Sequence, residues 1–153
     1  MTKPSTDDRV EIYDLLATYA WAIDTADVDT LVSLFTEDGW AQTGPAGRRS
    51  IRDFAIFYAT ERKEFRGRQH IVSCPVIRGN NDQATVRSYM TSVQWKKADD
   101  SKAIISLGYW EDVVVKRDGK WLFQQRVIKS WNDAAVPGWD DNVAKAERSK
   151  HAS

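Results

Sequence analysis

The hydrophobic and polar residues of the chain recur with a helical period in its first part and with a period of two after residue 70. In the first part, two neighbouring rows at helical spacing predict one long helix with a broad core-facing side. The first row is Ile12, Leu16, Tyr19 and Ile23, and the second row is Tyr13, Ala17, Ala20 and Asp24. Asp24 is the only charged residue in either row, so this helix is expected to point one carboxylate inward.

Two shorter helices are predicted to follow. Asp27 has a side chain suited to an N-cap, and it predicts a helix that stops by Asp38-Gly39. Trp40 is expected on a short strand after that stop. Ser50 and Asp53 have the spacing of a capping box and predict the start of a third helix.

The alternation after residue 70 predicts strands. Four such runs are separated by short polar turns, and they cover roughly residues 70–78, 84–97, 103–116 and 120–132. Short turns make antiparallel neighbours. Helices followed by a long meander indicate an α+β domain, in which a strongly curved, mostly antiparallel sheet wraps the helices and leaves a pocket between them. The domain is expected to span residues 1–139, and a polar, loose tail is expected over residues 140–153.

Composition narrows the classes of function. The 153 residues carry 22 basic and 22 acidic side chains, so the chain lacks the basic field that nucleic acid or anionic lipid attracts. No apolar run approaches the ~20 residues that span a bilayer, and the N-terminus lacks the apolar stretch of a secretory signal. The lone Cys74 excludes an internal disulfide and a multi-cysteine zinc site. We therefore expect a cytoplasmic protein that binds neither nucleic acid nor membrane.

One histidine and one acid are the best candidates for chemistry. His70 begins the first long strand, where its side chain can face the mouth of a pocket, whereas His151 lies in the polar tail. The inward carboxylate of Asp24 is unfavourable unless a cationic or hydrogen-bonding group meets it, and an imidazole would do so. Such a carboxylate fixes the tautomer of the ring and makes its other nitrogen a better proton acceptor. The alternatives are a surface histidine bonded to backbone and an Asp24 that points to water.

A second set of candidates surrounds Arg126. Two-residue alternation puts Arg126 on one strand face with Gln124, Ser130 and Asn132, and this polar face lines either the pocket or solvent. Trp40 is the tryptophan that we place at a substrate. The sequence contains no glycine-rich phosphate loop, no nucleophile elbow and no clustered metal ligands, so we expect no cofactor and no metal.

Several segments of the chain resemble the SnoaL-like branch of the nuclear transport factor 2-like superfamily, particularly scytalone dehydratase and γ-hexachlorocyclohexane dehydrochlorinase. The resemblance covers roughly residues 7–133, and its segments are residues 8–10, 19–24, 34–40, 68–70 and 117–121. It implies a cone-shaped α+β barrel. It also implies an Asp–His general base at Asp24 and His70, a substrate contact at Trp40 and a strand residue near the pocket at Arg126.

Two positions depart from the resemblance. Tyr19 stands where the dehydrochlorinase has a lysine, and Ile23 stands where scytalone dehydratase has a tyrosine. Neither named substrate is therefore implied. We expect a cofactor-independent, dehydratase-like lyase or isomerase that acts on a small apolar, aromatic or cyclic substrate. His70 would take a proton from carbon, while Tyr19, Arg126 or Asn132 would stabilise negative charge or help a hydroxyl to leave.

Two other functions stay open at this stage. One is a non-catalytic module that binds a small molecule. The other is an epoxide-hydrolase-like enzyme, which would need an Asp–Arg–Asp set, although no second inward aspartate is evident beside Asp24 and Arg126.

Aromatic residues on the outer face of the sheet predict a homo-oligomer. Depending on the strand register, they include Tyr89, Trp95 or Trp110, and exposed aromatic sheet faces are typical of subunit contacts. Trp121 and Trp131 are expected on the strand face opposite Arg126, in the core or at such a contact. The resemblance favours a trimer, and a dimer is the alternative.

Overall fold

The computed structural model describes residues 3–43, 47–60, 63–131 and 138–150. The first part contains α1 (Thr6–Thr25), α2 (Val28–Ser33), β1 (Phe35–Thr43), β2 (Gly47–Ser50) and α3 (Ile51–Thr60). The second part contains β3 (Phe65–Gly79), β4 (Gln83–Lys96), β5 (Lys102–Arg117), β6 (Lys120–Ser130) and α4 (Trp139–Lys150).

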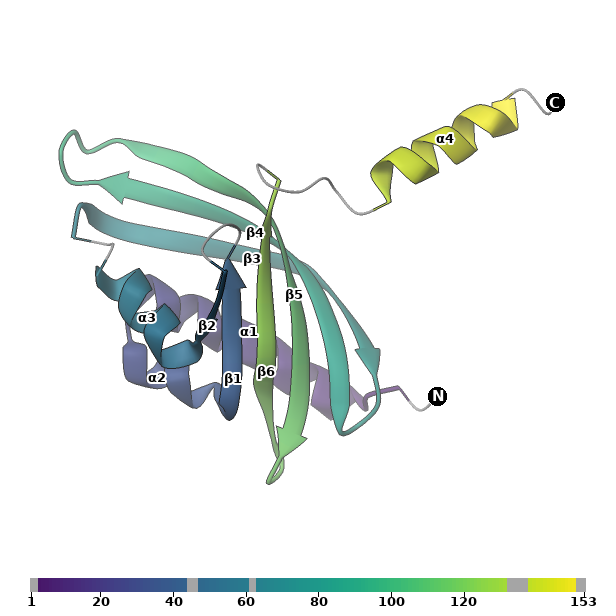
Figure 1. The fold of residues 1–153 in the computed structure, drawn as a ribbon, viewed down its shortest axis with the longest axis horizontal. Helices are drawn as coiled ribbons and strands as arrows, with labels where there is room; N and C mark the ends of the chain where they lie inside the picture. Colours follow the sequence, from purple (N-terminus) through teal and green to yellow (C-terminus); the bar gives the residue numbers. More distant parts are fainter. Residues whose placement is uncertain (1–2, 44–46, 61–62, 132–137, 151–153) are drawn as a thin grey trace.

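The six strands form one mixed sheet in the order β2-β1-β6-β5-β4-β3. All neighbours are antiparallel except β1 and β6, which are parallel. The sheet curves around α1, with α2 and α3 beside it, and its edge strands β2 and β3 do not pair with each other (Figure 1). The predicted α+β cone is confirmed, as an open curved sheet rather than a closed barrel.

Local sequence explains where the elements begin and turn. Asp27 caps α2 by accepting a hydrogen bond from the backbone N–H of Thr30. At the start of α3, the Ser50 hydroxyl accepts a hydrogen bond from the backbone N–H of Asp53 and donates one to the Asp53 carboxylate. The β5–β6 hairpin turns at Asp118-Gly119, where both residues have positive φ, as this turn type requires. The predicted caps and hairpins are therefore confirmed.

Two predicted boundaries are wrong. The second helix ends at Ser33 instead of continuing to Asp38-Gly39, because the chain from Phe35 onward pairs with β6 as strand β1. The first long strand begins at Phe65, earlier than residue 70, because its start pairs with the end of β4. In both cases the boundary is determined by pairing with a distant strand, and the pattern within the segment itself does not reveal it.

The buried side of α1 is rotated from the predicted one. The first predicted row is fully in the core, but Tyr13 is 47% exposed and Ala17 is also exposed. Leu15 and Ala22, on the other flank of that row, are buried instead. Asp24 consequently lies at the edge of the buried side and not within it.

Strand alternation separates an inner face, which covers α1, from an outer face. The buried positions of β4 are every second residue from Ala84 to Gln94. Trp110 is paired with Ser88 in the ladder and is 1% exposed, so its expected place on the outer face is wrong. Tyr89 and Trp95 are 51% and 39% exposed, as predicted.

Apolar side chains gather on the outer face around Tyr89. Its ring meets that of Trp131 edge to face, and Ile71 and Leu107 are also more than 40% exposed. A contiguous apolar sheet face of this kind favours self-association. The homo-oligomer, with a trimer favoured, stays a prediction.

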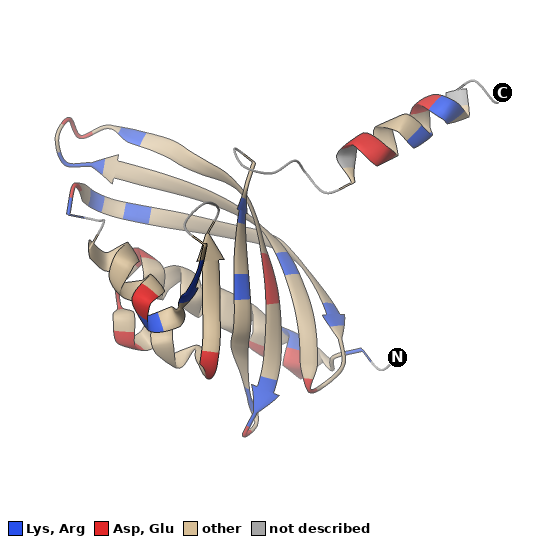
Figure 2. Cartoon of the chain, viewed as in Figure 1, with Lys and Arg blue, Asp and Glu red and all other residues tan. Residues whose placement is uncertain are grey.

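The tail that was expected to be loose contains a helix. Residues Trp139–Lys150 form α4, which lies apart from the sheet and carries both acidic and basic residues (Figures 1 and 2). Asp140 and Asp141 stand in its first turn, where negative charge is favourable, and alanine and long charged residues follow. Among the described helices, none has the length and apolar character that would let it cross a membrane.

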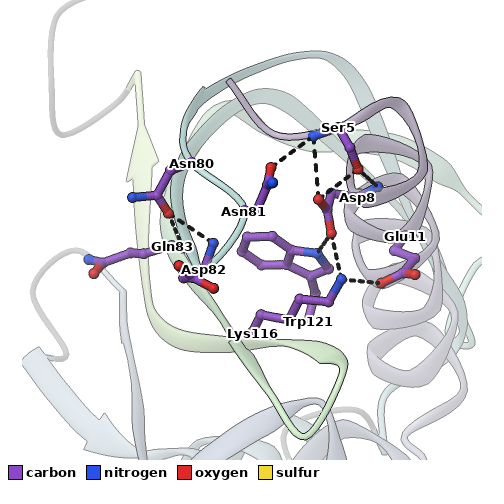
Figure 3. Close-up of polar contacts among 9 residues, drawn as sticks. All are labelled: Ser5, Asp8, Glu11, Asn80, Asn81, Asp82, Gln83, Lys116 and Trp121. Atoms are coloured by element: carbon purple, nitrogen blue, oxygen red, sulfur yellow. Dashed lines mark hydrogen bonds and ion pairs between the residues drawn. The ribbon is translucent and has the colours of Figure 1, made fainter. Parts of the chain in front are cut away.

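A buried carboxylate fixes the start of α1 to the sheet (Figure 3). Asp8 accepts hydrogen bonds from Lys116 Nζ at 2.6 Å, from Trp121 Nε1 at 2.9 Å and from Ser5 Oγ at 2.7 Å. The backbone N–H of Ser5 also donates to Asn81 in the β3–β4 turn. These hydrogen bonds, led by the one from Lys116, hold the pKa of Asp8 well below its usual value.

We predict that Asp8→Asn lowers the free energy of unfolding at pH 7 by about 1.5–3 kcal/mol, the scale of hydrogen bonds to a charged group. The folded-state pKa of Asp8 is depressed, so its stabilisation is complete above the unfolded-state pKa of about 3.9 and is lost as the pH falls toward the folded-state value. Urea unfolding of both proteins between pH 7 and pH 2 measures the difference in their free energies of unfolding. This difference should be constant down to about pH 4 and should shrink at lower pH.

The control is Glu11→Gln, because Glu11 is 4.0 Å from the same Lys116 but about half exposed. It should unfold almost as the wild type does. A gap for Asp8→Asn that does not change with pH would show that the carboxylate charge is unimportant.

Candidate active site

The last turn of α1 and the first half of β3 meet at Asp24 and His70. Asp24 Oδ1 lies 2.6 Å from His70 Nδ1, and Asp24 Oδ2 accepts a 2.8 Å hydrogen bond from the backbone N–H of His70. The side chains of His70 and Asp24 are 6% and 14% exposed. One carboxylate therefore holds both the main chain and the ring of the histidine in a covered position.

This geometry determines which ring nitrogen can act as a base. A carboxylate accepts hydrogen bonds, so the hydrogen of a neutral His70 ring lies on Nδ1 and the lone pair lies on Nε2. The negative charge of Asp24 also stabilises the imidazolium that forms when Nε2 takes a proton. The pair has the arrangement of a general base, and the contact predicted between its two members is present.

The imidazole is connected to a buried aromatic cluster through Trp110. The His70 and Trp110 ring centroids lie 6.0 Å apart, and Trp110 meets Tyr19 edge to face at 5.1 Å. The Arg126 guanidinium lies 3.8 Å from the centroid of Tyr19 and 3.9 Å from that of Trp110. Tyr19 and Arg126, two of the predicted site residues, therefore belong to the interior that Asp24 and His70 border.

Arg126 is bound to a carboxylate that sequence analysis missed. Its Nε and Nη2 atoms donate to the two oxygens of Asp112 at 2.8 and 2.7 Å, and both side chains are 0% exposed. Burial works against the charge of Arg126, but the attraction and hydrogen bonds of Asp112 raise its pKa above the usual value. Burial raises the pKa of Asp112 and of Tyr19. The two charges form a bidentate pair that is neutral overall.

A β-bulge explains why Arg126 lies inside. The ladder pairs Val113 with Gln125 and Val114 with Phe123, so Gln124 is an extra residue on β6. Alternation shifts by one residue there, and Arg126 shares the inner face with Phe123, whose ring lies 4.2 Å from the guanidinium. The prediction that Arg126 shares a face with Gln124 and lies opposite Trp121 is therefore wrong. Trp121 is in the core, as expected.

Trp40, a predicted substrate contact, is not brought to the pair. Trp40 neighbours the fully buried Ala41 on β1, so alternation turns Trp40 to the opposite face, where Arg48 lies 4.3 Å from its ring centroid. Asn132 lies outside the described residues, and its role stays a prediction.

Two hollows lie elsewhere on the molecule. One of about 550 Å³ is on the outer face of the sheet, with Arg87 and Glu111 in its lining, and one of about 690 Å³ lies beside Phe65. Neither is lined by Asp24 or His70, so neither is the enclosed pocket that we expected.

Several polar atoms of the inner face lack a hydrogen-bond partner in the described part of the chain. In the described part of the chain, buried atoms without a well-formed hydrogen bond include Tyr19 Oη, Ser88 Oγ, Ser92 Oγ, Trp110 Nε1 and Arg126 Nη1. Ser92 is directly opposite His70 in the β3–β4 ladder. Native interiors retain few such atoms without a reason, so the inner face differs from an ordinary core.

Sequence analysis missed Asp112, Trp110 and Ser92. A signal for Asp112 was present, since an acid beside the run Val113–Val115 in a buried strand requires a partner. We expected no second inward aspartate, and the buried Asp112 shows that this expectation was wrong. Asp24 is bonded to His70 and not to Arg126, so the two aspartates do not form the Asp–Arg–Asp set of the epoxide-hydrolase alternative.

The chain also matches a known protein family. The model of the SnoaL-like domain matches residues 4–127, which is most of the chain. The chain belongs to the SnoaL-like family. A search of curated proteins found no significant match to this SnoaL-like chain.

Solved structures share the fold of this SnoaL-like protein. A protein of unknown function with a cystatin-like fold from Nostoc punctiforme is 29% identical, with a TM-score of 0.71 over 90% of this chain and 98% of that one. A candidate scytalone dehydratase from Novosphingobium aromaticivorans is 26% identical, with a TM-score of 0.72 over 86% and 93%. LinA is 18% identical, with a TM-score of 0.70 over 80% and 84%, and supports the fold alone.

We predict that Arg126→Met destabilises the SnoaL-like domain by about 3–5 kcal/mol, because it leaves Asp112 buried without its partner. The double variant Arg126→Met with Asp112→Leu should recover much of this loss. Urea unfolding at pH 7 measures both effects.

The control is Arg87→Met. Arg87 makes an equally short cross-strand pair with Glu111, but that pair is exposed and should contribute at most about 1 kcal/mol. Equal losses for Arg87→Met and Arg126→Met would contradict the importance of burial.

Proposed function

We propose that the protein is a cofactor-independent lyase or isomerase, most similar in chemistry to a dehydratase, in which His70 is the general base. The observation that carries this proposal is the pair of hydrogen bonds that Asp24 accepts from the ring and the backbone N–H of His70. The family and the candidate scytalone dehydratase among its relatives support it. Loss of water from a hydroxyketone begins when a base removes a proton from carbon.

The reaction can be written from the residues present. Nε2 of His70 takes a proton from a carbon next to a carbonyl, and the electron pair of the C–H bond moves toward the carbonyl oxygen. In dehydration, the neighbouring C–O bond then breaks, and the imidazolium returns its proton to the departing hydroxyl, so one water leaves. In isomerisation, the proton returns to a different carbon of the same substrate.

Tyr19 and Arg126 are placed to stabilise the negative charge that develops. Tyr19 Oη and Arg126 Nη1 are buried donors without a well-formed partner in the described part of the chain, and burial strengthens such donors. Asp112 fixes the orientation of the guanidinium, so that Nη1 can donate without moving. Asn132, the third residue that we expected in this role, is not needed for this arrangement.

We predict that the protein accelerates exchange of the acidic C1 hydrogens of 2-tetralone, a small bicyclic ketone, for deuterium in D₂O. Because general-base catalysis contributes about 10²–10⁴-fold, His70→Gln should reduce the acceleration by that order. Asp24→Asn should also reduce it, since it removes the charge that stabilises the imidazolium. Proton NMR of the ketone follows the exchange.

Asp14→Asn is the matched control, because Asp14 is an exposed acid on the same helix. It should exchange the ketone as the wild type does. If 2-tetralone binds but the wild type does not accelerate its hydrogen exchange, this result would contradict the proposed catalysis and favour a non-catalytic module that binds a small molecule.

A further inference from the structure

Two of the unpartnered atoms lie next to the general base. Ser92 Oγ and Trp110 Nε1 belong to side chains that are 2% and 1% exposed, and neither has a hydrogen bond in the described part of the chain. A buried donor without an acceptor is unfavourable to the fold, so its retention points to a partner from outside the chain. Neither residue has a role in the reaction derived above.

The ladder and the ring contacts place both residues around His70. Ser92 is the direct cross-strand neighbour of His70, and such neighbours have Cβ atoms about 4.5–5.5 Å apart on the same sheet face. The Trp110 ring approaches the imidazole from β5, with 6.0 Å between the ring centroids. Groups on two strands therefore border the imidazole.

We propose that Ser92 and Trp110 bind an oxygen atom of the substrate beside His70, so that the substrate is a neutral carbonyl or hydroxyl compound and not a hydrocarbon or an alkyl halide. This inference rests on the proposed function and specifies its substrate class. The indole N–H can only donate, so it requires an acceptor on the ligand. A ketone or hydroxyl oxygen accepts such bonds well, whereas a hydrocarbon cannot accept them.

The charges of the interior favour a neutral oxygen over a carboxylate. Arg126, the fully buried cation beside Trp110, already forms a bidentate pair with Asp112. Asp24 adds a negative charge at His70. A ligand carboxylate brought to this place would meet two negative charges, on Asp24 and Asp112, against the single positive charge of Arg126.

The experiment compares 2-tetralone with tetralin, which has the same two rings without the oxygen. Titration followed by intrinsic tryptophan fluorescence should show at least about tenfold tighter binding of 2-tetralone to the wild type. Ser92→Ala should reduce this preference about five- to tenfold, as expected for one hydrogen bond, while tetralin binding is unchanged. Because the Ser92 hydroxyl has no partner in the fold, Ser92→Ala should unfold at the same or a higher temperature.

Ser88→Ala is the matched control. Ser88 is on the same strand and face, is 1% exposed and is equally unpartnered, but it lies opposite Trp110 instead of His70. It should keep the wild-type preference for the ketone. For Trp110, the indole N–H resonance, assigned by its loss in Trp110→Phe, should move downfield with 2-tetralone and not with tetralin.

Equal affinity of the wild type for both compounds would overturn the inference, and so would binding of neither. The inference would also be overturned if Ser92→Ala kept the preference for the ketone and the indole N–H resonance did not move when the ketone was added. The Ser92 hydroxyl would then bind only water.

The proposed function is tested separately. If His70→Gln keeps the preference for the ketone, but neither the wild type nor any variant accelerates its hydrogen exchange, the oxygen site stands and the catalytic proposal fails. If exchange requires His70 but the preference ignores Ser92, only the oxygen site fails.

Discussion

The contact of Asp24 with His70 determines both the position of a helix and the chemistry of a side chain. Through the backbone N–H of His70, the carboxylate fixes the end of α1 to strand β3. Through Nδ1, it fixes the tautomer of the imidazole. Asp8 fixes the other end of α1 to β5 and β6, so the 20-residue helix is held at both ends by carboxylates. His70 is therefore bonded to a helix that is itself held to the sheet at both ends.

The interior beyond this pair is polar in an unusual way. Its full charges, on Arg126 and Asp112, cancel each other, while several hydroxyl and N–H groups remain without partners in the described residues. An interior of this kind supplies directed hydrogen bonds without a strong net field. Such an environment suits the stabilisation of charge that appears only during a reaction, because a preorganised donor gains most when negative charge develops.

Local patterns in the sequence were sufficient for part of this description. Helix caps at Asp27 and Ser50, the Asp118-Gly119 turn and the inward tendency of Asp24 depend on residues close to one another in the chain. The pairing of Asp24 with His70 could be proposed because an inward acid requires a partner and the sequence offered one suitable histidine. The resemblance to the SnoaL-like family supported the same two residues.

The remainder depends on long-range pairing. Strict alternation puts Arg126 on the wrong face, because it cannot reveal that Gln124 is an extra residue, which only the register against β5 shows. The same uncertainty of register left Trp110 without a defined face, although it proved to be the link between His70 and the buried aromatic cluster. The end of α2 was misplaced because β1 pairs with a strand almost ninety residues later, at Phe35 and Phe123.

The two-fold use of the Asp24 carboxylate has a consequence for comparing members of the family. The bond to the main-chain amide of residue 70 does not depend on which side chain that residue carries. A relative that had lost its imidazole would still gain from an acid at the end of its first helix. The acid is thus a feature of the architecture, whereas the imidazole is the group that the proposed reaction requires.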